Sequence, residues 1–60
     1  MAFIKRTHKI LILDPVSTNR KIYGKLLEKE GHKVFEAKTL DEALAVLDQQ
    51  PQLKVMITNL

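Results

Sequence analysis

The sequence predicts an α/β fold in which two helices alternate with the strands of a parallel sheet. Two runs, Ile10–Leu13 and Val55–Ile57, are apolar without interruption, which is typical of strands buried on both faces. Helical signals over residues 17–30 and 40–50 separate these runs from each other and from an alternating run at Lys33–Ala37. The order strand, helix, strand, helix, strand indicates a three-stranded parallel sheet, because parallel strands need such crossover connections.

The first strand, Lys9–Leu13, should end at a turn formed by Asp14 and Pro15. Proline lacks a backbone donor and disfavours helical structure at the residue before it. Ser17 or Thr18 then offers an N-cap oxygen for the first helix.

The first helix is expected to continue to about Glu30, with Gly31 in the C′ position that closes it. Gly24 in its interior costs about 1 kcal/mol relative to alanine, which a close packing neighbour would explain. The apolar stripe expected to face the core consists of Ile22, Leu26 and Leu27.

The second strand, Lys33–Ala37, alternates in polarity and is expected at an edge of the sheet. Thr39 and Glu42 have the spacing of a capping box at the start of the second helix, and Pro51 prevents that helix from continuing. The third strand is Lys54–Thr58. With the apolar first strand in the centre, the expected strand order is 2-1-3 with one helix on each face. The stripe expected to be buried on the second helix consists of Ala43, Leu44 and Leu47.

Length and composition limit the chain to one small domain. Its 60 residues contain no cysteine, which excludes disulfides and thiolate metal sites and fits a reducing compartment. No apolar run approaches the roughly 20 residues of a membrane span, and residues 1–9 lack the apolar core of a signal peptide. We therefore expect a cytoplasmic protein with a basic leader at residues 1–8, a domain at residues 9–60, and no membrane contact.

The charge balance is mildly basic, with ten Lys and Arg against seven Asp and Glu. Beyond the leader, the cations are spread along the chain. A nucleic-acid-binding surface would need them gathered on one face or interleaved with aromatic residues, and only Phe3, Tyr23 and Phe35 are aromatic. Nucleic-acid binding is therefore a disfavoured alternative.

Six segments between Lys9 and Leu60 share their order and spacing with a known family. They are Ile10–Asp14, Ser17–Arg20, Leu26–His32, Val34 with Ala37, Asp41–Leu44 and Val55–Leu60. In these segments the chain resembles the N-terminal half of a response-regulator receiver domain, the CheY-like fold of two-component signalling. The resemblance implies a βαβαβ half of a flavodoxin-like fold, truncated just after its third strand.

The same resemblance implies a degenerate phosphorylation site. Receivers carry two acidic residues after the first strand, which help to hold magnesium; Asp14 matches the first, but Pro15 stands at the second. The phosphoacceptor aspartate at the end of the third strand is replaced by Asn59, whose carboxamide is a very poor nucleophile. Magnesium is usually bound through carboxylates, and Asp14 alone remains. We therefore expect no enzyme, no catalytic residue, no metal and no cofactor.

Structural roles compete for the same residues. Asp14 before Pro15 suits an Asx turn, and Asn59 could satisfy backbone groups at a strand end. His8 and His32 share no metal-ligand spacing, and His32 is expected to be a partly buried ring.

The sequence thus predicts a truncated, non-phosphorylatable receiver-like module that binds a protein partner in a signalling pathway. An open edge of the third strand, formed by Val55, Met56 and Ile57, predicts a homodimer, because such an edge is a template for pairing with another chain. The alternatives are a fragment of a longer response regulator or hybrid kinase, and a small basic nucleic-acid-binding protein.

Overall fold

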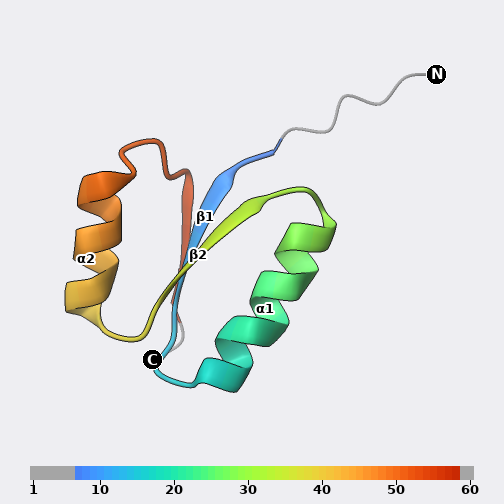
Figure 1. Ribbon diagram of the computed structural model, residues 1–60, viewed down its shortest axis with the longest axis horizontal. Helices are drawn as coiled ribbons and strands as arrows, with labels where there is room; N and C mark the ends of the chain where they lie inside the picture. Colours follow the sequence, from blue (N-terminus) through green and yellow to red (C-terminus); the bar gives the residue numbers. More distant parts are fainter. Residues whose placement is uncertain (1–6, 59–60) are drawn as a thin grey trace.

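The structure, a computed structural model, describes residues 7–58. Strands and helices alternate along the chain (Figure 1), and the predicted α/β class and β-α-β-α alternation are confirmed. The elements are β1 (Lys9–Leu13), α1 (Ser17–Lys29), β2 (Lys33–Ala37), α2 (Leu40–Gln49) and β3 (Val55–Thr58).

The sheet has the strand order β2-β1-β3, and both pairings are parallel. The register places Lys9 beside Lys33 of β2 and Ile10 beside Val55 of β3. All strands therefore start at one end of the sheet, here called the amino end, and finish at the opposite carboxyl end. The side chains that precede or follow the strands are consequently gathered at these two ends.

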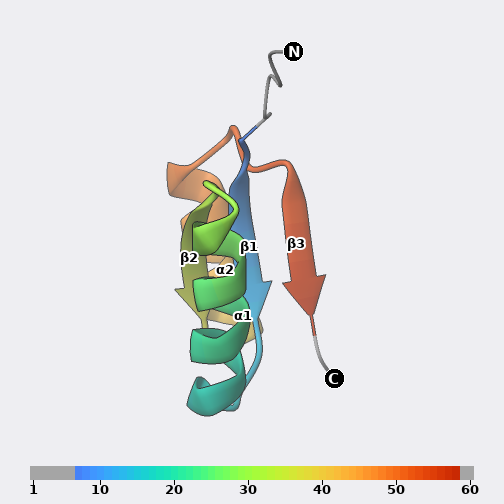
Figure 2. The ribbon, with the colours of Figure 1, turned by 90° about the vertical axis from the view of Figure 1, so that its right-hand side faces the viewer.

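The two helices lie on opposite faces of the sheet (Figure 1). Both pack on β1 and β2, and within residues 7–58 neither packs against β3. Figure 2 shows β3 to one side of both helices. The central strand is thus covered on both faces, as its apolar sequence predicts, while β3 extends beyond the helical layers.

The core is centred on β1, whose residues 10–13 are all buried. Its α2 side contains Leu11, Leu13, Ala37 and Ala43, and Phe35, Val46 and Leu53 pack against this group. Ile10 and Ile12 are also buried, and they point to the α1 side because successive side chains of a strand alternate between faces.

The predicted helix ends are largely confirmed. Gly31 has a φ of 91° and donates its N–H to the Glu28 carbonyl at 2.9 Å, while the His32 N–H reaches the Leu27 carbonyl at 3.1 Å. This pair of bonds is a Schellman motif, which needs the left-handed conformation that glycine adopts readily.

The second helix begins with the predicted capping box. The Glu42 N–H donates to Thr39 Oγ1 at 3.2 Å, and the Thr39 N–H donates to Glu42 Oε2 at 3.2 Å. The predicted cap of the first helix is wrong: its N-cap is Val16, and no side chain caps it. The helix has already begun at Ser17, so the hydroxyls of Ser17 and Thr18 lie inside its first turn.

The predicted apolar stripes are partly wrong. On α1, Ile22 and Leu26 are 51% and 59% exposed, while Leu27 is half-buried and Gly24 is buried. On α2, Ala43 is buried as predicted, but Leu44 and Leu47 are 54% and 37% exposed. Each helix covers β1 and β2 along a narrow line of residues, so within residues 7–58 no sheet or helix covers the adjoining apolar flank.

Candidate functional site

The residues predicted to form a degenerate phosphorylation site belong to the carboxyl end of the sheet. Asp14 follows β1 directly and is 1% exposed. Its Oδ1 accepts a hydrogen bond from the Val16 N–H at 2.8 Å, and its own N–H donates to the Ala37 carbonyl at 3.1 Å. The predicted Asx turn is therefore confirmed, and this carboxylate supports the loop that leads from β1 into α1.

Arg20 ties the start of α1 to the same loop. Its Nη1 donates to the Asp14 carbonyl at 2.6 Å, and its Nε lies 3.2 Å from Glu36 Oε1 on β2. The guanidinium is mostly buried, with 15% of the side chain exposed. A fixed positive charge beside Asp14 opposes the binding of a divalent cation there.

The other predicted site residues add no ligand to this end. Pro15 is exposed and has no side-chain donor or acceptor, and Asn59 lies outside the described residues. Within residues 7–58 there is no group of three histidine, aspartate or glutamate side chains that could hold a metal ion. Among the described residues of this end that were predicted to form the site, Asp14 is the one carboxylate, and it is engaged in a turn, whereas magnesium is usually bound through one or two carboxylates plus phosphate oxygens.

The edge predicted to associate, Val55 to Ile57, lies in β3, which pairs with β1 alone among the strands described. Its second row of backbone N–H and C=O groups therefore has no partner strand within residues 7–58.

The amino end of the sheet contains a pair of residues that sequence reasoning did not bring together. The His8 N–H donates to His32 Nδ1 at 3.0 Å, and the two rings stack with centroids 5.6 Å apart and planes inclined by 13°. Because Nδ1 accepts this bond, the proton of the neutral His32 ring lies on Nε2. The sequence feature that could have predicted this pair is the register of the parallel strands. His8 and His32 directly precede Lys9 and Lys33, which are paired in the sheet.

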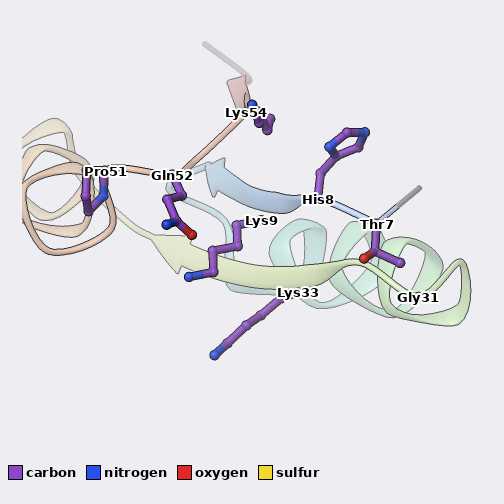
Figure 3. Close-up of a pocket in the computed structure, with 8 residues that line it drawn as sticks. All are labelled: Thr7, His8, Lys9, Gly31, Lys33, Pro51, Gln52 and Lys54. Carbon is purple, nitrogen blue, oxygen red and sulfur yellow. The ribbon is translucent and has the colours of Figure 1, made fainter.

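Beside this pair lies an open hollow of about 660 Å³. The start of β1, the turn after α1 and the loop before β3 line it (Figure 3). Its charged lining residues are Lys9 and Lys33, which begin β1 and β2, and Lys54, which directly precedes β3; no acidic side chain lines it. At the carboxyl end the charged side chains thus hold the loop after β1, whereas basic side chains line the hollow at the amino end.

Comparisons with protein-family models, with curated proteins and with solved structures give no match to the chain. In the part that the structure describes, neither helix has the length and apolarity that crossing a bilayer demands.

Proposed function

We propose that the chain is a receiver-like half-domain of two-component signalling that works in the cytoplasm by binding protein and is not phosphorylated. Two lines of support are independent of each other. The six sequence segments resemble a receiver, and the order β2-β1-β3 with a helix on each face is the arrangement expected for the first half of a flavodoxin-like fold. The state of Asp14, Pro15 and Arg20 at the carboxyl end disfavours phosphoryl chemistry.

The observation that carries the proposal of protein binding is the pair of uncovered apolar flanks on the helices. A small domain rarely leaves so many large apolar side chains in water unless a partner covers them. The flank of α1 contains Ile22, Tyr23 and Leu26, which are 39–59% exposed, and the flank of α2 contains Leu40, Leu44 and Leu47, which are 37–61% exposed.

Helix geometry turns both flanks toward the same side of the molecule. Helix α1 meets the sheet through Gly24 and Leu27, so at 3.6 residues per turn Tyr23 and Leu26 project to one side of this contact line, while Ile22 points away from the sheet. Helix α1 is right-handed and runs opposite to the strands. The side of the contact line to which Tyr23 and Leu26 project is therefore the side on which β3 lies (Figure 2).

The same reasoning applies to α2, which meets the sheet through Ala43 and Val46 and lies on the other face. Its flank also turns toward β3. The two flanks therefore stand on either side of the open β3 edge, and the three features form one surface, here called the β3 side.

We propose a second copy of the chain as the partner for the β3 side. A two-fold axis perpendicular to the sheet would pair β3 with β3 antiparallel, which extends the sheet and brings like helices together on each face. Charge favours this arrangement, because the exposed Lys21 and Lys25 lie on the opposite flank of α1. The ammonium groups of Lys21 and Lys25 would thus face away from the second copy.

Sedimentation equilibrium tests the homodimer. We expect a monomer–dimer equilibrium at micromolar concentrations, and Leu26→Lys should shift it toward monomer. Glu28→Gln is the matched control, since it raises the net charge by the same one unit on the opposite flank of α1. A folded monomer at high micromolar concentration would contradict the homodimer, as would equal effects of the two substitutions.

The alternative, that the chain is part of a longer response regulator or hybrid kinase, relies on the same flanks. In that case further strands and helices of the regulator would cover the β3 side. Two results together would favour this alternative. The chain would be a folded monomer at high micromolar concentration, and a longer chain that includes the further strands and helices would unfold cooperatively and with higher stability.

A further inference from the structure

The fold gathers three lysines that are far apart in the sequence. The parallel register puts Lys9 beside Lys33, and the Lys54 N–H donates to the Lys9 carbonyl at 3.1 Å. Lys9 and Lys33 at the starts of β1 and β2, and Lys54 just before β3, thus each contribute one ammonium group to the amino end. The cations that look scattered along the sequence are, for these three positions, concentrated in space.

None of these three lysines forms an ion pair within residues 7–54. Lys9 Nζ donates to the neutral Gln50 Oε1 at 3.3 Å, and Lys33 Nζ lies 5.6 Å from the centroid of the Phe35 ring. These contacts hold the side chains without neutralising them. Three positive charges therefore remain uncompensated by side chains around the hollow.

The ends of the two helices are the main opposing feature. Both helices finish at the amino end, where each contributes a partial negative charge of about half a unit. The last carbonyls of α1 are partly satisfied by the Gly31 and His32 N–H groups, and the Val46 carbonyl of α2 by the Gln50 N–H. Three full positive charges thus line the hollow against two half charges at the helix ends, and the Glu30 carboxylate at the end of α1 is not part of the lining.

The directions of the side chains bear on the shape of the ligand. Figure 3 shows the ammonium groups of Lys9 and Lys33 on one side of β1, and Lys54 with the His8 ring on the other side. A single tetrahedral anion bound on one side of β1 would face one of these two sets. An anion with several linked charges could pass across the start of β1 and contact both.

We propose that the amino-end hollow binds an oligophosphate, a chain of linked phosphate groups. The volume of about 660 Å³ lies within the range of small-molecule sites, and no carboxylate lines the hollow to repel the anion. His8 completes the lining on the Lys54 side. This site lies at the opposite end of the sheet from the receiver-like residues and is independent of the proposed protein contact.

The test is a titration with sodium tripolyphosphate, followed by the amide signals of the ¹⁵N-labelled full chain. We expect saturable shifts centred on residues 7–9, 31–33 and 51–54, and weaker binding as salt is raised. Lys33→Gln with Lys54→Gln should weaken binding about fivefold, as expected for two exposed charge pairs. Lys21→Gln with Lys25→Gln, which removes the same charge from α1, should change the affinity less than about twofold because that flank lies outside the hollow.

Several results would overturn the proposal. Equal losses from the two lysine pairs would show that only net charge matters, and shifts centred elsewhere would place the anion at another surface. Equal affinity for inorganic phosphate would contradict the requirement for linked charges. Far tighter binding of a single-stranded oligonucleotide at the same residues would replace the oligophosphate with nucleic acid. Thermal unfolding of each variant shows whether the fold is retained, and all four lysines substituted are exposed.

Discussion

The two ends of the sheet differ in how their charged side chains are used. At the carboxyl end, buried Asp14 is engaged by the backbone of its own turn, and Arg20 spans from that turn to Glu36. At the amino end, Lys33 and Lys54 are exposed and have no acidic partner within the described residues. Asp14 therefore has a structural role although it lies at the carboxyl end of a parallel sheet, where ligands usually bind. At the amino end, for which the sequence predicted no role, the lysines have no acidic partner among the described residues.

The largest expected effect tests the structural role of the carboxyl end. Asp14→Ala should lower the free energy of unfolding by about 1–3 kcal/mol, because the Val16 N–H loses the carboxylate acceptor that the buried Asp14 side chain supplies. Thermal unfolding followed by circular dichroism measures this loss. Asp14→Asn keeps an acceptor oxygen and should recover much of it, and the exposed Asp48→Ala is the control. An Asp14→Ala variant as stable as the parent would show that the turn does not depend on this side chain.

The next effect concerns the histidine pair at the amino end. His32→Phe keeps an aromatic ring but removes the Nδ1 acceptor of the His8 N–H, and we expect a loss of about 1 kcal/mol. His8→Ala removes the stacked ring and retains the backbone donor, so its cost should be smaller. Chemical denaturation of both variants makes the comparison. A larger cost for His8→Ala would assign the stabilisation to ring stacking.

A gain in stability is expected on the face of α1 that covers the sheet. A Cβ at Gly24 would lie 3.7 Å from Val34 Cγ1, an ordinary contact distance, so Gly24→Ala should stabilise the helix by up to about 1 kcal/mol. The same substitution at Gly31 should destabilise, because Gly31 has a φ of 91°. Melting temperatures of the two variants should move in opposite directions; movement in the same direction would contradict the assigned roles of the two glycines.

The smallest effect belongs to the ion pair at the carboxyl end. Glu36 is 46% exposed, so solvent screens its attraction to Arg20, and Glu36→Gln should cost no more than about 0.5 kcal/mol. Thermal unfolding in low and high salt measures this contribution. A loss comparable with that of Asp14→Ala would mean that the ion pair, rather than the Asx turn, holds this loop.

Local sequence signals predicted the elements well and the exposed surfaces poorly. Pro15, Gly31 and the Thr39–Glu42 capping box mark element boundaries through backbone chemistry that acts over a few residues, and the structure places the boundaries there. The burial of Leu26 and Leu44 was mispredicted because periodicity identifies an apolar flank without showing whether any element covers it.

The amino end escaped sequence prediction for a different reason. His8 and His32, like Lys9 and Lys33, are 24 residues apart, and only the parallel register of β1 with β2 makes them neighbours. At the carboxyl end, the Asx turn of Asp14 was predictable because it spans two residues. The bond from Arg20 to Asp14 required the placement of α1 against the sheet.

The central claim is that this chain works by contact and not by phosphoryl transfer. The most direct test is intact mass measurement after incubation with acetyl phosphate and magnesium, for the parent chain and for Asn59→Asp, which restores the carboxylate that receivers carry at this position. We expect neither protein to gain a phosphoryl group, because Pro15 supplies no ligand and Arg20 lies beside Asp14. A stoichiometric phosphoryl adduct on either protein would contradict the account.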